Sequence, residues 1–475
     1  MSPAVLYRRL PGEGLDAFIA GFRKAAGHDP FGTVFIAPTA SLAREVVRRL
    51  GEEGVPLVAD AVTTLAGIAR KIVSEHAARE TLIPAAGSRL IIARLLAGGD
   101  YPLLSGAGAV DDLAILFSVL TMRKVDYPAA LGDLQGAKSA EIAALYRTYT
   151  RFLDGHRLID ESTLTARAIR LLSGDFRTVY VYGLFEPMPL ERDLLLALRE
   201  SAEEFFYAIP CAANPAVFAD DGGWLHPDKI IEGKQTSAVA GLFSQQKPEN
   251  GDLIRIAERR DRLDEVRAIA QEIRDLAATG VRPGDIAVAF PDLDGAAPYV
   301  DEVFPDFGVP CTVSVGRPLS ASPLVQALLS VLAAPARGYR RSDVIALVTS
   351  PYLPFTRGSK LDILSREARI VAGTWDERLV ALAANLDEQP EPEAARDRNA
   401  EKIAAIEAAR ITIRRLFADL ATLEGAKTIP DHIAAYRLLL DTWRAPVMPG
   451  GGEPDLLDDE ARDLAGFTRA LAELE

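Results

Sequence analysis

The pattern of apolar and polar positions changes several times along the chain, and each change predicts a different kind of element. Residues 4–10 and 33–38 are short apolar runs rich in β-forming side chains, which predicts two strands. Each run is followed by a segment with helical spacing of its apolar positions, at 15–25 and 41–50, which predicts two helices. Strands that alternate with helices over short connections are typical of a parallel α/β sheet.

Between residues 62 and 172 the helical period dominates, and we expect an all-helical insertion of roughly a hundred residues that contains no strand. Strand character returns at 177–184 and at 203–210, with a helical segment between the two. These strands are expected to rejoin the N-terminal sheet, because consecutive elements of one α/β unit usually pack together.

Residues 212–250 are rich in Ala, Gly, Pro and Gln, which predicts a linker. A second α/β unit is expected after it, with strands at 253–257, 286–290 and 310–315. From residue 342 onward the pattern is helical again. The predicted fold class is therefore α/β, with two parallel sheets and two large helical blocks.

The composition is that of a globular protein with several domains. The chain has 475 residues, of which 49% are hydrophobic and 25% charged, and about three or four domains are expected at this length. Two cysteines are too few for a disulfide framework or an iron–sulfur cluster, which fits the cytoplasm. The first residues contain no apolar signal core and no run approaches ~18 apolar residues, so no contact with a membrane is expected.

The net charge is −14. A protein that binds nucleic acid over its whole surface is usually basic. The acidic total therefore argues against such a surface, but it does not exclude a local basic channel.

A turn after the first predicted strand occupies the position where a phosphate-binding loop would lie. It contains Gly12 and Gly14, but Asp16, Ala17 and Phe18 follow, where such a loop needs a Lys for the phosphates and a Ser or Thr for magnesium. We interpret this segment as a plain tight turn and expect no nucleotide hydrolysis there.

The string HPDKIIEGK at residues 226–234 contains the letters of a PD-(D/E)xK metal-dependent nuclease motif. Its Asp228 and Glu232 share one short segment inside the predicted linker, so we interpret it as an exposed polar loop. The five histidines form no clustered metal motif, and no GxSxG sequence is present. No catalytic residue, metal ligand or cofactor is expected in this stretch.

The best candidate for a binding site is the end of the second predicted strand with the helix that follows it. Thr39 lies at the strand end and Ser41 is the candidate N-cap, while Arg44 and Arg48 share one helix face by their i, i+4 spacing. A helix N-terminus with arginines beside it suits a phosphate group. Ordinary solvated helix charges explain the same pattern equally well.

Residues 263–334 resemble the start of the second motor domain of UvrD-type superfamily 1 DNA helicases. The resemblance rests on a glutamate near the start of a helix, a turn that leads into D-I-A-V, a G-x-P strand and two Pro-Leu pairs. These positions are Glu265, Gly280, Asp285, Gly308–Pro310, Pro318, Leu319, Pro323 and Leu324. Pro291 and Asp292 stand where the helicases have an arginine.

Residues 179–198 resemble the AddB/RexB subunit of bacterial helicase–nucleases. In an active helicase this strand ends in an acidic metal-binding motif, but here Tyr182 and Gly183 stand at that place. Together with Gly12 and Gly14, they mark a degenerate nucleotide site. The run at 33–50 resembles the motif that contacts single-stranded DNA in superfamily 1 helicases.

The resemblance implies two RecA-like parallel-sheet domains, each with a large all-helical insertion. It also implies that a PD-(D/E)xK nuclease with an iron–sulfur cluster would lie downstream of residue 475. The expected ranges are 1–61 with 173–215 for the first RecA-like domain, 62–172 for its insertion, 216–250 for a linker, 251–335 for the first part of the second RecA-like domain and 336–475 for the second insertion.

The implied function is that of a non-hydrolysing, helicase-like part of an AddB-like helicase–nuclease in double-strand-break repair and recombination. It would bind DNA, through Thr39, Ser41, Arg44 and Arg48, for a partner motor and nuclease subunit. The alternative from another class is a protein–protein scaffold with an idle helicase-like fold and no DNA binding. A third interpretation is an ATPase with an unrecognised nucleotide site.

Overall fold

The computed structural model divides into two compact units, Met1–Ile256 (unit 1) and Ala257–Glu475 (unit 2), and each is described by itself. The residues that it describes are 3–9, 14–77, 79–106, 108–125, 136–174, 176–210, 222–233, 255–316, 318–353, 355, 359–387, 393–425, 427–443 and 454–474.

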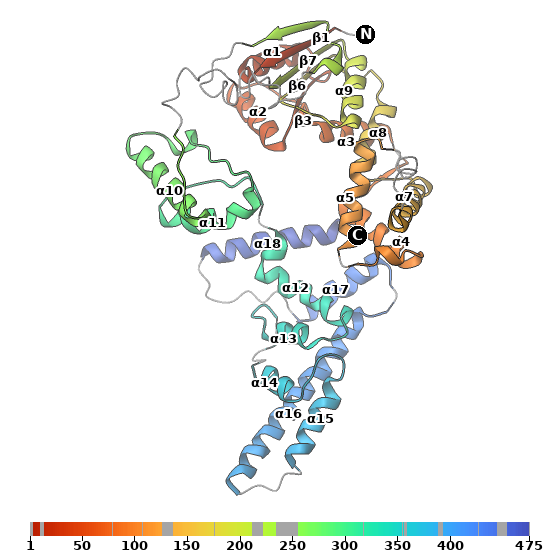
Figure 1. Ribbon diagram of the computed structural model, residues 1–475, viewed down its shortest axis with the longest axis vertical. Coiled ribbons are helices and arrows are strands. Elements are labelled where there is room, and N and C mark those ends of the chain that lie inside the picture. Colours follow the sequence, from red (N-terminus) through yellow and green to blue (C-terminus); the bar gives the residue numbers. More distant parts are fainter. Residues whose placement is uncertain are drawn as a thin grey trace. The chain divides into compact units, whose positions relative to one another are not determined.

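Unit 1 is built on one six-stranded sheet with the order β3-β2-β6-β7-β1-β8, in which every neighbouring pair is parallel (Figure 1). The α/β class and the return of the later strands to the N-terminal sheet are thereby confirmed. The strands are β1 (Ala4–Arg9), β2 (Thr33–Ala37), β3 (Val62–Thr64), β6 (Thr178–Tyr182), β7 (Glu204–Pro210) and β8 (Lys229–Glu232).

Helices cover both faces of this sheet. On one face α1 (Leu15–His28) and α2 (Ala40–Glu52) pack against the strands through side chains such as Phe22 and Val46. On the other face lie α3 (Leu65–His76), α8 (Glu161–Leu171) and α9 (Pro189–Ser201). Because both faces are covered, β2 and β6 are buried along their whole length, which explains their continuous apolar sequences.

The region 62–172 contains strands, so the prediction that it has none is wrong. β3 extends the main sheet beside β2, and β4 (Thr81–Leu82) pairs with β5 (Leu158–Ile159). The central helices α4 (Ala85–Gly98), α5 (Ala109–Met122) and α7 (Ala137–His156) have a separate core. Strands of two or three residues are too short for a period of two to become visible in a sequence.

The predicted linker also contributes to the sheet. Among its described residues, 222–233, a short 3-10 turn (Gly223–Leu225) leads into β8, which pairs with β1 at the edge of the sheet. The interpretation of residues 226–234 as an exposed polar loop is therefore wrong for the described part of that segment. An edge strand has one neighbour and exposed side chains, so it tolerates the polar composition that suggested a loop.

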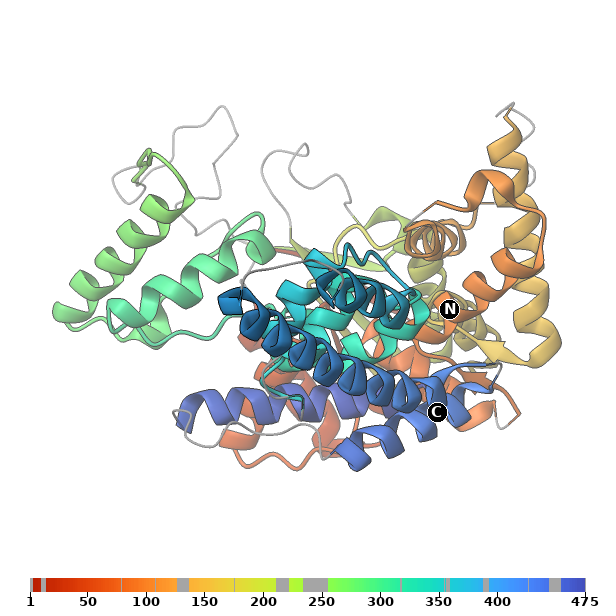
Figure 2. The ribbon, with the colours of Figure 1, turned by 90° about the horizontal axis from the view of Figure 1, so that it is seen from below.

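Unit 2 is helical over its described residues. The pair α10 (Arg262–Ala278) and α11 (Leu293–Asp306) shares a small core that includes Val266 and Phe304. A larger core surrounds Trp375, and the long α16 lies against α15 (Figure 1, Figure 2). The remaining helices are α12 (Pro323–Ala336), α13 (Arg341–Thr349), α14 (Ser359–Glu367), α15 (Trp375–Asp387), α16 (Glu393–Leu420), α17 (Ile429–Trp443) and α18 (Pro454–Ala472).

The strands expected at 286–290 and 310–315 are not formed, since no strand occurs among the described residues of unit 2. Both segments border a hollow of about 590 Å³ beside α10 and α11. Ile286 and Phe290 pack toward the core of these helices, whereas Val288 is 38% exposed. A buried parallel strand needs paired neighbours on the ladder, and these segments have none among the described residues. A second RecA-like sheet remains a prediction.

Candidate nucleic-acid interface

The carboxyl ends of β2 and β6 lie side by side, because the two strands are parallel neighbours and Ile36 stands opposite Val181. The chains remain close beyond the strands. A Cβ atom placed on Gly183 would lie 3.5 Å from Cγ of Pro38. The carboxyl edge of an open parallel sheet is where such folds bind ligands, and the residues predicted for both the DNA site and the nucleotide site follow these two strand ends.

Three of the four predicted DNA-contacting residues lie at the start of α2. Thr39 is the N-cap, and its side chain accepts a hydrogen bond from the Leu42 backbone N–H at 3.2 Å. The predicted cap was Ser41, two residues further on. Ser41 and Arg44 are both exposed, and Nη2 of Arg44 donates to the Ser41 hydroxyl at 3.3 Å. The positive end of the helix dipole, a hydroxyl and a guanidinium therefore occupy one exposed turn.

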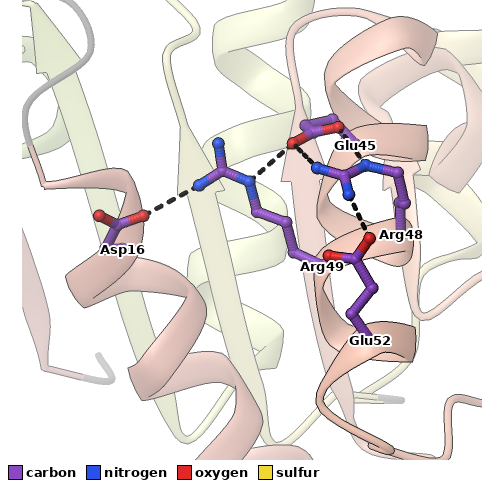
Figure 3. Close-up of polar contacts among 5 residues, drawn as sticks. All are labelled: Asp16, Glu45, Arg48, Arg49 and Glu52. Atoms are coloured by element: carbon purple, nitrogen blue, oxygen red, sulfur yellow. Dashed lines mark hydrogen bonds and ion pairs between the residues drawn. The ribbon is translucent and has the colours of Figure 1, made fainter. Parts of the chain in front are cut away.

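The guanidinium of Arg48, the fourth predicted contact, is bound by two carboxylates of its own helix (Figure 3). Its Nε and Nη2 donate to Glu45 at 2.8 and 2.7 Å, and its Nη1 pairs with Glu52. Arg49 also donates to Glu45, at 2.7 Å, and reaches Asp16 on α1 at 2.9 Å. The spacing Glu45–Arg48–Glu52 was visible in the sequence and could have indicated this pairing.

Glu45 remains ionised over the whole working range of pH. Hydrogen bonds from Arg48 and Arg49 lower the pKa of the Glu45 carboxyl from 4.5 to about 2. The same pairing raises the pKa of Arg48. A phosphate group would have to compete with this carboxylate for Arg48, whereas none of the ion pairs between described residues engages Arg44.

The degenerate nucleotide site is closed by aromatic packing. Gly12 lies outside the described residues, and Gly14 is the N-cap of α1 in the left-handed conformation, with φ of 78°. The Tyr182 ring at the end of β6 is 8% exposed and lies 5.6 Å from the ring of Phe18 in α1. An apolar contact thus occupies the position for which the helicase resemblance implies an acidic, metal-binding side chain.

The residues of the nuclease-like string hold the edge strand in place. The Asp228 carboxylate accepts a hydrogen bond from the backbone N–H of Ala4 at 2.7 Å and a second from Nη2 of Arg199 at 3.1 Å. The bond from Ala4, followed by the charge of Arg199, lowers the pKa of Asp228. Among the described residues, no group of three or more His, Cys, Asp or Glu side chains could hold a metal ion.

Sequence reasoning missed two residues near these sites. Arg199 is 4% exposed although it is charged, and its position four residues after Leu195 on the apolar face of α9 was the available signal. Phe185 follows β6 at the carboxyl edge and is 54% exposed. Its exposure could not be predicted, because a single aromatic residue after a strand is more often buried.

None of the described helices combines the length and the apolar composition that a membrane crossing requires.

Comparison with known proteins finds similarity to one kind of protein, the AddB subunit of ATP-dependent helicase/deoxyribonucleases. The chain is 30% identical over 189 residues to this protein of Heliobacterium modesticaldum, a match that covers 38% of this chain and 15% of that protein. It is 28% identical over 167 residues to the protein of the same name from Desulforudis audaxviator, which covers 35% of this chain and 14% of the relative. No family model matches the chain.

A shorter match, 34% identical over 89 residues, is found with the protein of the same name from Limosilactobacillus reuteri, and it covers 18% of this chain and 7% of that protein. The matched stretches therefore span a small part of the length of these relatives. They support the resemblance to AddB proteins that residues 179–198 indicated, over the part of the chain that is matched.

Proposed function

We propose that this chain is the helicase-like, non-hydrolysing part of an AddB-like helicase–nuclease, and that it binds single-stranded DNA at the carboxyl edge of the unit 1 sheet. Its role would be to hold DNA for a partner motor and nuclease subunit during double-strand-break repair and recombination, in the cytoplasm. The similarity to proteins named as the AddB component of an ATP-dependent helicase/deoxyribonuclease supports this assignment.

The absence of hydrolysis is argued from the residues around α1. Leu15 and Asp16 follow Gly14, so no Lys or Ser/Thr is available at the helix start for a triphosphate and its magnesium. Tyr182 at the end of β6 supplies no carboxylate, and its ring packs on Phe18. The sheet offers a helix N-terminus there, but not the side chains that phosphoryl transfer needs.

The observation that carries the DNA-binding proposal is the exposed first turn of α2. Thr39, Ser41 and Arg44 lie together there, and Arg44 is exposed outside the carboxylate network that binds Arg48. Backbone N–H groups at a helix start and a guanidinium bind phosphate oxygens without regard to sequence. Binding is therefore expected to be weak, independent of base sequence and strongly dependent on salt.

The experiment is a fluorescence anisotropy titration of a labelled oligothymidylate with the full chain at several salt concentrations. The variant Arg44→Ala should weaken binding and reduce the salt slope by about 1. Arg48→Ala is the matched control, because it removes the same charge from the same helix, but from a guanidinium already bound by Glu45 and Glu52. Equal binding by the wild type and Arg44→Ala would remove the α2 site from the proposal.

A scaffold that docks a protein partner is the second candidate function, and the net charge of −14 favours it. Like charges on the protein and the DNA backbone repel each other over distances set by the salt concentration. If the wild-type chain fails to bind the oligonucleotide even at low salt, the scaffold interpretation replaces the DNA-binding one.

A further inference from the structure

A half-exposed aromatic side chain stands at the same sheet edge as the start of α2. Phe185 follows β6 by three residues and is 54% exposed. Large apolar side chains at a sheet edge are normally covered unless they meet another molecule. Its position beside a proposed phosphate-binding turn makes this ring a candidate for contact with a nucleobase.

The loop that carries Phe185 is fixed on both sides. Before it, the backbone N–H of Gly183 donates to the Ala208 carbonyl at 2.8 Å, and the carbonyl of Leu184 accepts a hydrogen bond from the Tyr207 hydroxyl. After it, the Met188 N–H donates to Glu191 at 2.7 Å. A loop held in this way presents the ring in one place, so little conformational entropy is lost when a flat partner binds.

The strand register places the ring beside the α2 site. β6 and β2 are parallel neighbours, and their continuations touch at Gly183 and Pro38. Phe185 lies two residues beyond that contact on one chain, and Thr39 one residue beyond it on the other. An aromatic ring and a phosphate-binding helix start are therefore offered side by side, which is the arrangement that single-stranded DNA binding requires.

We propose that Phe185 stacks on a base of a single DNA strand whose phosphates contact the first turn of α2. This inference rests on the DNA-binding function proposed above. A phenyl ring carries no hydrogen-bonding group, so the contact would tolerate any base and would not read sequence. Phe185 would thus place the strand across the sheet edge, while Arg44 and the helix start supply the charge.

The test compares variants of the full chain in binding to oligothymidylate and to an abasic oligonucleotide with the same phosphates. Phe185→Ala should weaken oligothymidylate binding about tenfold and leave abasic binding unchanged. Phe185→Leu keeps an apolar side chain in the loop and should lose nearly as much affinity. Phe31→Ala is the matched control, because Phe31 is 77% exposed but precedes β2, at the amino edge of the sheet.

A second readout detects stacking directly. Phe185→Trp should show quenching of the added tryptophan by oligothymidylate and not by the abasic strand, relative to the wild type with its three native tryptophans. If both Phe185→Ala and Phe185→Leu bind like the wild type while Arg44→Ala is weakened, the stacking inference is wrong and the α2 site stands. If the wild type binds no oligonucleotide, the proposed function and this inference both fail.

Discussion

Arg199 of α9 and Asp228 at the start of β8 form an ion pair at 3.1 Å that closes the edge of the unit 1 sheet. The arginine side chain is 5% exposed, and its Nη1 also donates to the backbone carbonyls of Leu225 and His226. The aspartate in turn holds the N–H of Ala4 at the start of β1. One buried guanidinium therefore attaches a polar edge strand, far along the sequence, to the helix layer beneath it.

We predict that Arg199→Ala destabilises unit 1 by about 3 kcal/mol, because it leaves two carbonyls and a carboxylate without their donor. Urea unfolding followed by tryptophan emission measures the loss, since Trp224 contacts Tyr207 beside this segment. Hydrogen exchange of residues 222–233 should also accelerate. Arg177→Ala is the control. Its pair with Glu203 is exposed on both sides, so it should cost under about 1 kcal/mol. Equal losses in the two variants would contradict this role of Arg199.

The success and failure of the sequence-based predictions follow from how far each signal reaches. The strands β2 and β6 were predicted because burial on both faces produces a continuous apolar run in a short segment. The edge strand β8 was missed because its order depends on Arg199 and Ala4, which lie far from Asp228 in sequence. Conversely, 286–290 has the composition of a strand, but no partner pairs with it among the described residues.

The candidate site was predictable in part. The strand–helix pattern located Thr39, Ser41 and Arg44 together, because these residues are neighbours on a single turn. The same pattern also proposed Arg48 as a contact. The structure adds that a guanidinium on the same face has a different value when Glu45 and Glu52 flank it. Exposure and pairing of side chains are properties of the folded surface, and spacing alone does not determine them.

We predict that the chain releases no phosphate from ATP, with or without single-stranded DNA. The reason is the missing Lys and Ser/Thr after Gly14 and the Tyr182 ring packed on Phe18. A colorimetric phosphate assay of the purified chain makes the measurement. A rate above buffer that falls on substitution Gly14→Val would show that the site hydrolyses nucleotide and would overturn the proposed inactivity.

Gly183 should tolerate no larger residue, and the cause is its backbone rather than its surroundings. Its φ is +74°, whereas a Cβ atom would make only ordinary contact with Pro38, at 3.5 Å. Gly183→Ala should therefore cost about 1 kcal/mol. Gly27→Ala in α1 provides the contrast, since nothing lies within 4 Å of its added Cβ, and a helical alanine should stabilise by about 0.5 kcal/mol. Thermal unfolding should shift in opposite directions for the two variants.

Acid should loosen the α15–α16 hairpin of unit 2. Hydrogen bonds from Arg410 and Arg414 lower the pKa of Asp376 from 3.8 to about 2. A depressed carboxyl pKa stabilises the fold above the unfolded value and ceases to do so as pH falls through the folded value. Hydrogen exchange in α15 should therefore rise between pH 3.8 and about 2, and Asp376→Asn should abolish that change. Glu377→Gln on the same turn is the control, and an identical response in both variants would contradict the assignment.

Glu45→Gln should strengthen binding of single-stranded DNA, because it releases the guanidinium of Arg48. Glu45 accepts two hydrogen bonds from Arg48 and one from Arg49, and its pKa of about 2 keeps it ionised at any working pH. Once freed, Arg48 would lie one turn from Arg44 on the same face, and the salt slope should steepen by about 1.

Glu52→Gln separates this effect from a general loss of negative charge. It removes the same charge from α2 but leaves the two-pronged contact between Arg48 and Glu45 intact. We therefore expect a clear gain in anisotropy-measured affinity for Glu45→Gln and a smaller one for Glu52→Gln. Equal gains would mean that only long-range electrostatics changed. No gain in either variant, combined with weakened binding in Arg44→Ala, would place the DNA strand on the first turn of α2 and away from Arg48.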